Sequence, residues 1–169
     1  MKKIVYPVLV SALLLSGCGE VSTNKYNKSI FQSVPKEKAE LLQSGKNKQY
    51  CAQCGMDLIK FYKTSHAASS ESKDKKYQYC SIHCLEDHLG HGVVLKNPKV
   101  VDVSSLKFIS VHDAKYVVGS SIRGTMSRVS KYAFSNIKDA KEFQKKYGGK
   151  IMDFNLALEK AKDDFKYYK

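Results

Sequence analysis

Four cysteines in two close pairs place the strongest limit on how this chain can fold. Cys51 and Cys54 are followed at once by Gly55, which allows a tight turn that points amide N–H groups at the sulfur atoms. An aromatic strand pattern ends at Cys80 and a helical pattern follows, so Cys84 falls in the first helical turn, where the helix dipole favours a thiolate. This layout predicts a treble-clef-like metal site.

Two other uses of the same cysteines stay open at this point. An even number of cysteines in an exported protein is also typical of disulfides, and four cysteines allow three connectivities. A redox-active dithiol is the third possibility. It normally places Cys-x-x-Cys at the start of a helix, an arrangement that the Gly55-Met56 sequence does not favour.

Two methionines bear on which metal such a site would hold. Met56 comes two residues after Cys54, and Met126 lies in the turn sequence Gly124-Thr125-Met126. Thioether sulfur is a soft ligand that suits Cu(I), and zinc rarely uses it. The pattern therefore favours copper, with the alternative that either methionine only fills the core.

The histidines are candidates to complete the site. His83 lies between Cys80 and Cys84, and His88 is one turn beyond Cys84. Either is close enough in sequence to be a ligand, although a surface or packing role is the alternative for each. The remaining histidines are weaker candidates: His66, His91 and His112.

The amino terminus predicts export and a lipid anchor. A basic start is followed by twelve apolar residues, 4–15, which are too few to span a bilayer but fit a secretory signal. The run ends in Leu-Ser-Gly before Cys18, a sequence that resembles a bacterial lipobox, whereas an ordinary cleaved signal is the alternative. We expect a signal peptide over residues 1–17, lipid on Cys18 and a periplasmic location, with the outer membrane favoured because residue 19 is not aspartate.

The net charge of +13 bears on which class of macromolecule the protein binds. In a cytoplasmic protein such a charge would suggest nucleic acid, but export and the scattered distribution of the lysines exclude that class. A solvated basic surface, or attraction to anionic lipid headgroups beside the anchor, explains the charge.

The chain divides into a tether and two similar halves. Residues 18–48 are polar and lysine-rich, which predicts a flexible tether with at most a short helix over 36–43. Residues 76–83 resemble residues 131–138, each an aromatic strand that runs into an N-cap and a helix. The fold class is therefore α+β, with two β-β-α-β halves over 49–103 and 104–169, a methionine turn upstream in each half and a terminal helix over 155–165.

These motifs together resemble the NosL family, lipoproteins that supply copper during maturation of nitrous oxide reductase. The resemblance covers about residues 49–155 and the lipobox. It is carried by Cys-x-x-Cys-Gly-Met, the later Gly-x-Met, the aromatic strand 132–134, and a helix block with Asp139, Ala140, Phe143, Gly148, Gly149 and Phe154. The region around Cys80 and Cys84 is also similar to heavy-metal-binding TRASH and YHS-type modules.

The resemblance implies an extracytoplasmic metallochaperone without catalytic activity. It would bind Cu(I) through sulfur and deliver it to a periplasmic copper enzyme, nitrous oxide reductase, or to its maturation factors. Cys54 and Met56 match the family's Cys-Gly-Met positions, and Met126 matches its downstream methionine. The chain departs from the family at Thr125, where proline is frequent, and in carrying Cys80 and Cys84. The alternatives are a structural Zn(II) site of Cys51, Cys54, Cys80 and Cys84 in a binding module, or a thiol–disulfide oxidoreductase.

Overall fold

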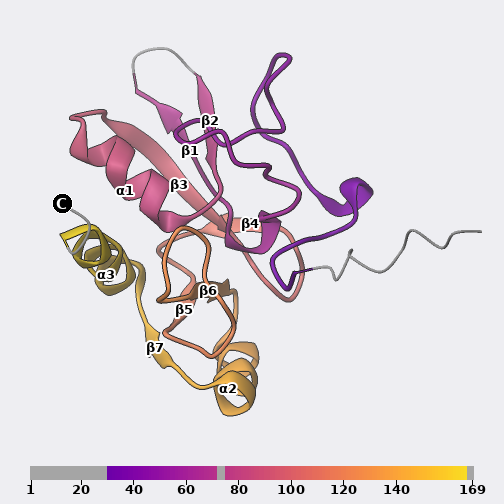
Figure 1. Ribbon diagram of the computed structural model, residues 1–169, viewed down its shortest axis with the longest axis vertical. Helices are drawn as coiled ribbons and strands as arrows, with labels where there is room; N and C mark the ends of the chain where they lie inside the picture. Colours follow the sequence, from indigo (N-terminus) through magenta and orange to yellow (C-terminus); the bar gives the residue numbers. More distant parts are fainter. Residues whose placement is uncertain (1–29, 72–74, 167–169) are drawn as a thin grey trace, which may run out of the picture.

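The computed structural model describes residues 30–71 and 75–166, which form two small antiparallel sheets and their helices (Figure 1). The predicted signal peptide and Cys18 lie outside the described residues. No helix of the described part is long and apolar enough to cross a membrane.

The first half holds a four-stranded sheet with the order β2-β1-β3-β4. All of its neighbouring strands are antiparallel, and the central strand β1 pairs with both β2 and β3, so that His66 lies opposite Tyr79 on one side and Val100 on the other. The elements of this half, in chain order, are β1 (His66–Ser70), β2 (Lys76–Tyr79), α1 (Ile82–Gly90), β3 (Leu95–Val101) and β4 (Phe108–Ser110).

The second half holds a three-stranded antiparallel sheet with the order β6-β5-β7. Its helix α2 begins after Asn136, whose side chain accepts a hydrogen bond from the Asp139 amide, and ends at Gly148, which has a φ of +73°. The elements are β5 (Lys115–Val118), β6 (Lys131–Phe134), α2 (Ile137–Tyr147), β7 (Lys150–Met152) and the terminal helix α3 (Phe154–Lys166).

The two halves repeat one topology, which confirms the predicted α+β fold of two β-β-α-β units. In each, the first strand is central, the next strand of the chain pairs on one side, and the strand after the helix pairs on the other. The predicted boundary after residue 103 differs from the structure, because β4 pairs with β3 and extends the first sheet. The change of sheet comes between β4 and β5.

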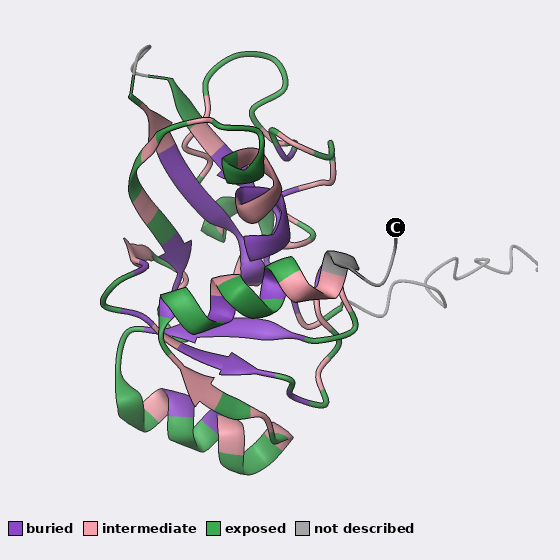
Figure 2. Ribbon diagram, turned by 90° about the vertical axis from the view of Figure 1, so that its left-hand side faces the viewer, coloured by how far each residue is buried: buried purple, intermediate pink, exposed green. Residues whose placement is uncertain are grey.

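One large core joins the halves, and a second belongs to the second half. Apolar residues of α1 and α3 pack together in the large core, among them Leu85, Ala157 and Ala161. Strands β5 and β6 are largely buried, while α2 exposes its outer side (Figure 2). The second core is aromatic, with Phe143 in ring contact with Phe134 at 5.1 Å. The halves therefore form one packed body.

Residues 30–48, predicted to be tether, lie against this body. Phe31 packs edge-on to Tyr132 at 5.2 Å, and the amide of Leu42 donates to the Gln78 side chain at 2.9 Å. The only regular element here is a short 3-10 helix, Lys36–Lys38, in place of the longer helix considered over 36–43. Long-range contacts thus hold residues 30–48 against the fold, although this segment shows no periodic pattern in its sequence.

Candidate metal centre

The first cysteine pair lies in a tight turn that precedes β1. The Cys51 amide donates to the Met56 carbonyl at 2.8 Å, and the Gly55 amide donates to the Cys51 carbonyl at 3.0 Å. Gly55 has a φ of +74°, a conformation that side chains with a Cβ rarely adopt. The amides of Cys54 and Met56 point at the sulfur atoms of Cys51 and Cys54, respectively. This is the knuckle that the Cys-x-x-Cys-Gly sequence predicted.

The second pair is held where β2 meets α1. Cys80 directly follows β2, and its carbonyl accepts a hydrogen bond from the Thr64 hydroxyl at 2.8 Å. Cys84 lies in the first turn of α1, near the positive end of the helix dipole. The end of β2 therefore positions Cys80, and the start of α1 positions Cys84.

All four Sγ atoms lie within 4.8 Å of one another, and all four cysteines are free thiols. The Cys80 sulfur is 3.5 Å from that of Cys54 and 3.7 Å from that of Cys84. A tetrahedral metal bound at ~2.3 Å from each thiolate needs sulfur atoms about 3.8 Å apart. The group is therefore already close to the spacing of a four-thiolate site.

Met56 brings a fifth sulfur atom to this group. Its Sδ lies 3.9 Å from the Cys80 Sγ, and its side chain packs at the edge of the main core. Three of the four cysteines are buried, whereas Cys54 is exposed, so the group opens to solvent on the Cys54 side. A soft ion could be bound inside and still be reached by an incoming ligand.

The thiols do not ionise equally. The neighbouring thiols of Cys54, Cys80 and Cys84 hydrogen bond to the Cys51 sulfur and hold its pKa well below the usual range. The hydrogen bond between Cys54 and Cys51 raises the pKa of Cys54, but hydrogen bonds from Cys80 and Cys84 outweigh it and bring the Cys54 pKa down to about 7. The pKa values of Cys80 and Cys84 are raised, first of all by their bonds to Cys51. Cys51 therefore ionises first and Cys54 next, and a cation bound by all four sulfur atoms must displace the protons of Cys80 and Cys84.

Both candidate histidines have other partners. The Nε2 of His83 lies 2.8 Å from Asp164 on α3, and the Nδ1 of His88 lies 2.8 Å from the Tyr79 hydroxyl. Within residues 30–71 and 75–166, no histidine joins the group of four sulfur atoms. The structure therefore places His83 in the contact between α1 and α3, and His88 against the tyrosines of β2.

Met126 lies in the connection between β5 and β6, whereas Met56 lies upstream of β1. The two methionine turns are therefore not equivalent positions of the repeat, contrary to the prediction. Met126 is 43% exposed and has a φ of +66°, an uncommon conformation for a residue other than glycine. The hydroxyl of the preceding Thr125 is 2.8 Å from that of Thr64, which also bonds to Cys80. The turn thus adjoins the backbone that carries the cysteines.

Asp164 is a connecting residue that the sequence did not reveal. Its Oδ2 accepts from Ser127 at 2.6 Å and from Lys131 at 2.7 Å, and His83 lies at 2.8 Å. Burial raises the pKa of Asp164, but these hydrogen bonds outweigh burial and lower it. The contact links the helix of Cys84 to the loop of Met126, and its partners are so distant in sequence that no local pattern indicates it.

Comparison with known proteins adds to this geometry. The family model of NosL matches residues 43–159, well over half of the chain, including both cysteine pairs and both methionine turns. The chain belongs to the NosL family. No curated protein matches the sequence.

A solved structure of the same family has a similar fold. The crystal structure of the copper chaperone NosL from Shewanella denitrificans is 28% identical in sequence and superposes with a TM-score of 0.53. The match covers 67% of this chain and 92% of that chain. The NosL fold thus accommodates the four-cysteine group seen here.

Proposed function

We propose that this NosL protein is a metallochaperone that binds Cu(I) outside the cytoplasm and delivers it to a copper enzyme. The observation that carries the proposal is the thioether of Met56, 3.9 Å from Cys80 at the edge of the thiol group. Zinc rarely binds a thioether, which is a soft, uncharged ligand, whereas Cu(I) prefers such sulfur atoms. Membership of the NosL family supports the same choice.

Delivery requires that the bound ion can be approached. Buried Cys51, Cys80 and Cys84 would hold the ion from within, while the exposed Cys54 leaves one side open. A ligand from an acceptor could then replace one sulfur atom at a time, so that copper need not be released to water. We propose nitrous oxide reductase, or one of its maturation factors, as the acceptor, and no catalytic role.

Titration with Cu(I) against a competing chelator tests the proposal. The protein is reduced under anaerobic conditions, and Met56→Leu and Met126→Leu are compared with Met152→Leu, a matched change in β7. Leucine keeps volume and apolar character, so each fold should survive at a cost under ~1.5 kcal/mol. Met56→Leu should lower Cu(I) affinity about tenfold or more, equal to about 1.4 kcal/mol, and Met152→Leu should not. Unchanged affinity in both Met56→Leu and Met126→Leu would remove the reason to choose copper.

Structural zinc is the second candidate, and the spacing of the four sulfur atoms favours it. Separations of 3.5 and 3.7 Å suit a closed tetrahedral site, and such a site would stabilise the first half. Metal analysis of protein purified under reducing conditions separates the two candidates. The structural role would be favoured if the protein contains stoichiometric zinc and if Met56→Leu does not change the affinity for zinc.

We also propose that lipid on Cys18 anchors the protein to the periplasmic face of a membrane, with the outer membrane favoured. The support is the lipobox-like sequence and its short apolar run. Cys18→Ser should release the protein into the soluble fraction without unfolding it, whereas Cys54→Ser should stay in the membrane fraction. Retention of Cys18→Ser in the membrane would contradict the anchor.

A further inference from the structure

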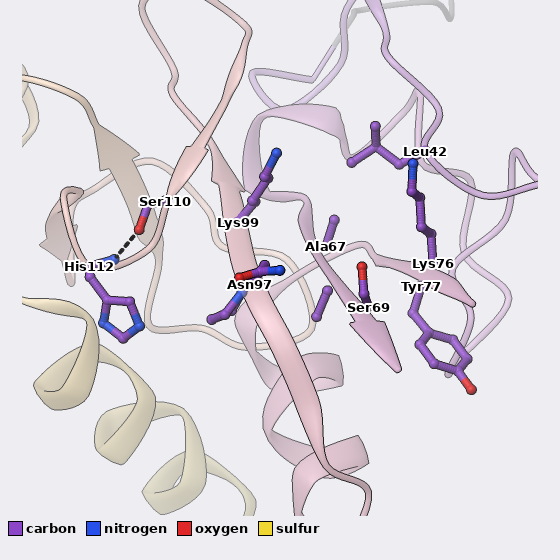
Figure 3. A pocket seen from close by; sticks show the side chains of 11 residues that line it. Leu42, Ala67, Ser69, Lys76, Tyr77, Asn97, Lys99, Ser110 and His112 are labelled. Atoms are coloured by element: carbon purple, nitrogen blue, oxygen red, sulfur yellow. Dashed lines mark hydrogen bonds between the residues drawn. The ribbon is translucent and has the colours of Figure 1, made fainter. Parts of the chain in front are cut away.

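Two adjoining hollows lie beside the first sheet, and one of them reaches the thiol group. One, of about 520 Å³, lies over β1 and β3 with Ala67 and Lys99 in its lining (Figure 3). The other, of about 820 Å³, is lined by Cys51 and Gly55. Both share Leu42, Lys76 and Tyr77, so they form one continuous surface that we call the basic groove.

The basic groove is positively charged along its length. Its lining includes Lys75, Lys76 and Lys99, and none of its described lining residues is acidic. Within the described part of the chain, no carboxylate forms an ion pair with these lysines, unlike Lys96, which pairs with Glu71 at 2.8 Å. The groove thus presents lysines that no described carboxylate neutralises, and it reaches the cysteine group at Cys51.

The edge strand β2 borders the groove and offers its backbone to it. The Gln78 carbonyl accepts a hydrogen bond from the Ala52 amide, so the backbone groups of Gln78 face away from β1. Alternate residues of a strand share this direction, so those of Lys76 also face outward, at the exposed end of β2. The Gln78 carbonyl is already bonded, so an extended segment lying along the groove could pair with the backbone of Lys76.

We propose that the basic groove binds an acidic, extended segment of the copper-accepting partner, a step that rests on the function proposed above. Carboxylates on the segment would pair with Lys76 and Lys99, and attraction between the opposite charges would orient the partner on approach. Cys51 and Gly55 line the same groove, and the neighbouring Cys54 is exposed, so a partner seated here would lie next to the cysteine group. The groove would thus select a partner with an acidic segment and position it near the cysteines.

A pair of labelled peptides tests the proposal on the full-length protein. One is a ten-residue peptide of alternating glutamate and threonine, and the other has glutamine in place of each glutamate. Fluorescence anisotropy should show that the acidic peptide binds at least about tenfold more tightly, with an advantage that shrinks as salt rises. Equal binding of the two peptides would overturn the proposal.

Two double variants with the same charge locate the effect. Lys76→Glu/Lys99→Glu should weaken binding of the acidic peptide at least about tenfold, while Lys138→Glu/Lys141→Glu, on exposed positions of α2 at the far end of the molecule, should change it less than about twofold (Figure 1). An equal loss in both would show that net charge alone attracts the peptide and would overturn the proposal.

Two further measurements distinguish this inference from the proposed chaperone function and from binding of the groove to a membrane. Cu(I) affinity should be the same in both double variants, and a protein that binds the peptide but no Cu(I) would contradict the chaperone function rather than the groove. Vesicles of anionic or of neutral phospholipid test the other acidic surface. If Lys76→Glu/Lys99→Glu abolishes binding to anionic vesicles and leaves the peptide unaffected, the groove faces a membrane and the proposal is wrong.

Discussion

The two halves of the molecule share one topology but differ at the junction between their second strand and their helix. In the first half this junction carries Cys80 and Cys84, and in the second half the corresponding residues of the repeated sequence are Ser135 and Asp139. Ser135 donates from its amide and its hydroxyl to Asp102, at 3.2 and 3.1 Å. The same backbone thus supports thiols for a metal in one half and hydrogen bonds in the other.

The two halves also differ in how the first turn of their helix is capped. Asn136 caps α2 by accepting from the Asp139 amide at 2.9 Å. Ser81, at the same position before α1, makes no side-chain cap, and its buried hydroxyl has no hydrogen-bond partner among the described residues. A cap is typically worth ~1 kcal/mol. The half with the four cysteines therefore lacks a local stabilisation that the other half has.

Removal of Cys80 and Cys84 should produce the largest effect. In Cys80→Ser/Cys84→Ser, metal should no longer stabilise the fold, and stabilisation is worth about 4 kcal/mol when free metal exceeds the dissociation constant a thousandfold. Urea unfolding with and without Cu(I) measures the difference, and the metal-free proteins serve as the control. If the variant keeps its Cu(I) affinity, copper depends on Cys54 and methionine, and the junction does not distinguish the halves.

Phe143→Ala should give the next largest effect, in the other half. Phe143 is nearly buried and contacts four rings, those of Phe31, Tyr132, Phe134 and Tyr147. Its truncation should lower the free energy of unfolding by about 3 kcal/mol. Cu(I) affinity of the protein that remains folded should not change, because the metal group lies in the first half. A parallel loss of affinity would show that the halves are not separable in function.

Acid should weaken the contact between the halves at His66. This buried residue of β1 lies 3.1 Å from the Tyr116 hydroxyl of β5, and burial lowers its pKa from 6.5 to about 3. Below pH 6.5 the unfolded chain binds a proton that the folded chain does not, so stability should fall by about 2 kcal/mol by pH 5. Unfolding of metal-free protein measured against pH should lose much of this slope in His66→Gln. The exposed His91→Gln is the control, and an unchanged slope in His66→Gln would contradict the assignment.

The smallest predicted effect compares the two helix starts directly. Asn136→Ala should lower the free energy of unfolding by about 1 kcal/mol, because it removes the cap of α2. Ser81→Ala should cost close to nothing, since alanine at this site removes a buried hydroxyl that has no partner in the described structure. Urea unfolding of both variants gives the comparison. Equal losses would mean that Ser81 supports α1 in a way that its contacts do not indicate.

Local patterns in the sequence predicted much of this molecule. The bounds of α2 follow from its cap at Asn136 and the glycine at its end, and the repeated aromatic strand indicated the two halves. The cysteine spacing predicted a single group because a knuckle and a strand-to-helix junction are both local structures. The choice between copper, zinc and disulfides depends on the ion and the redox state, which no local pattern fixes.

What the sequence did not predict depends on distant partners. Phe31 enters the aromatic core of the second half, and Asp164 contacts His83 across 81 positions of the chain. The pairing of β4 with β3 also depends on tertiary structure, because the sequence of a short strand does not indicate which sheet it will join. The same reason explains the error over the two methionine turns, whose similar sequences lie at different places in the repeat.

The packing of residues 30–48 against the body would also limit the reach of the protein if the proposed lipid anchor holds it at a membrane. With lipid on Cys18, only residues 18–29 would separate the membrane from the fold, and twelve residues reach no more than about 40 Å even when fully extended. The four cysteines would then stay within a short distance of the bilayer surface. An acceptor held in the same layer would meet it by diffusion in two dimensions, at a local concentration that does not depend on the volume of the compartment.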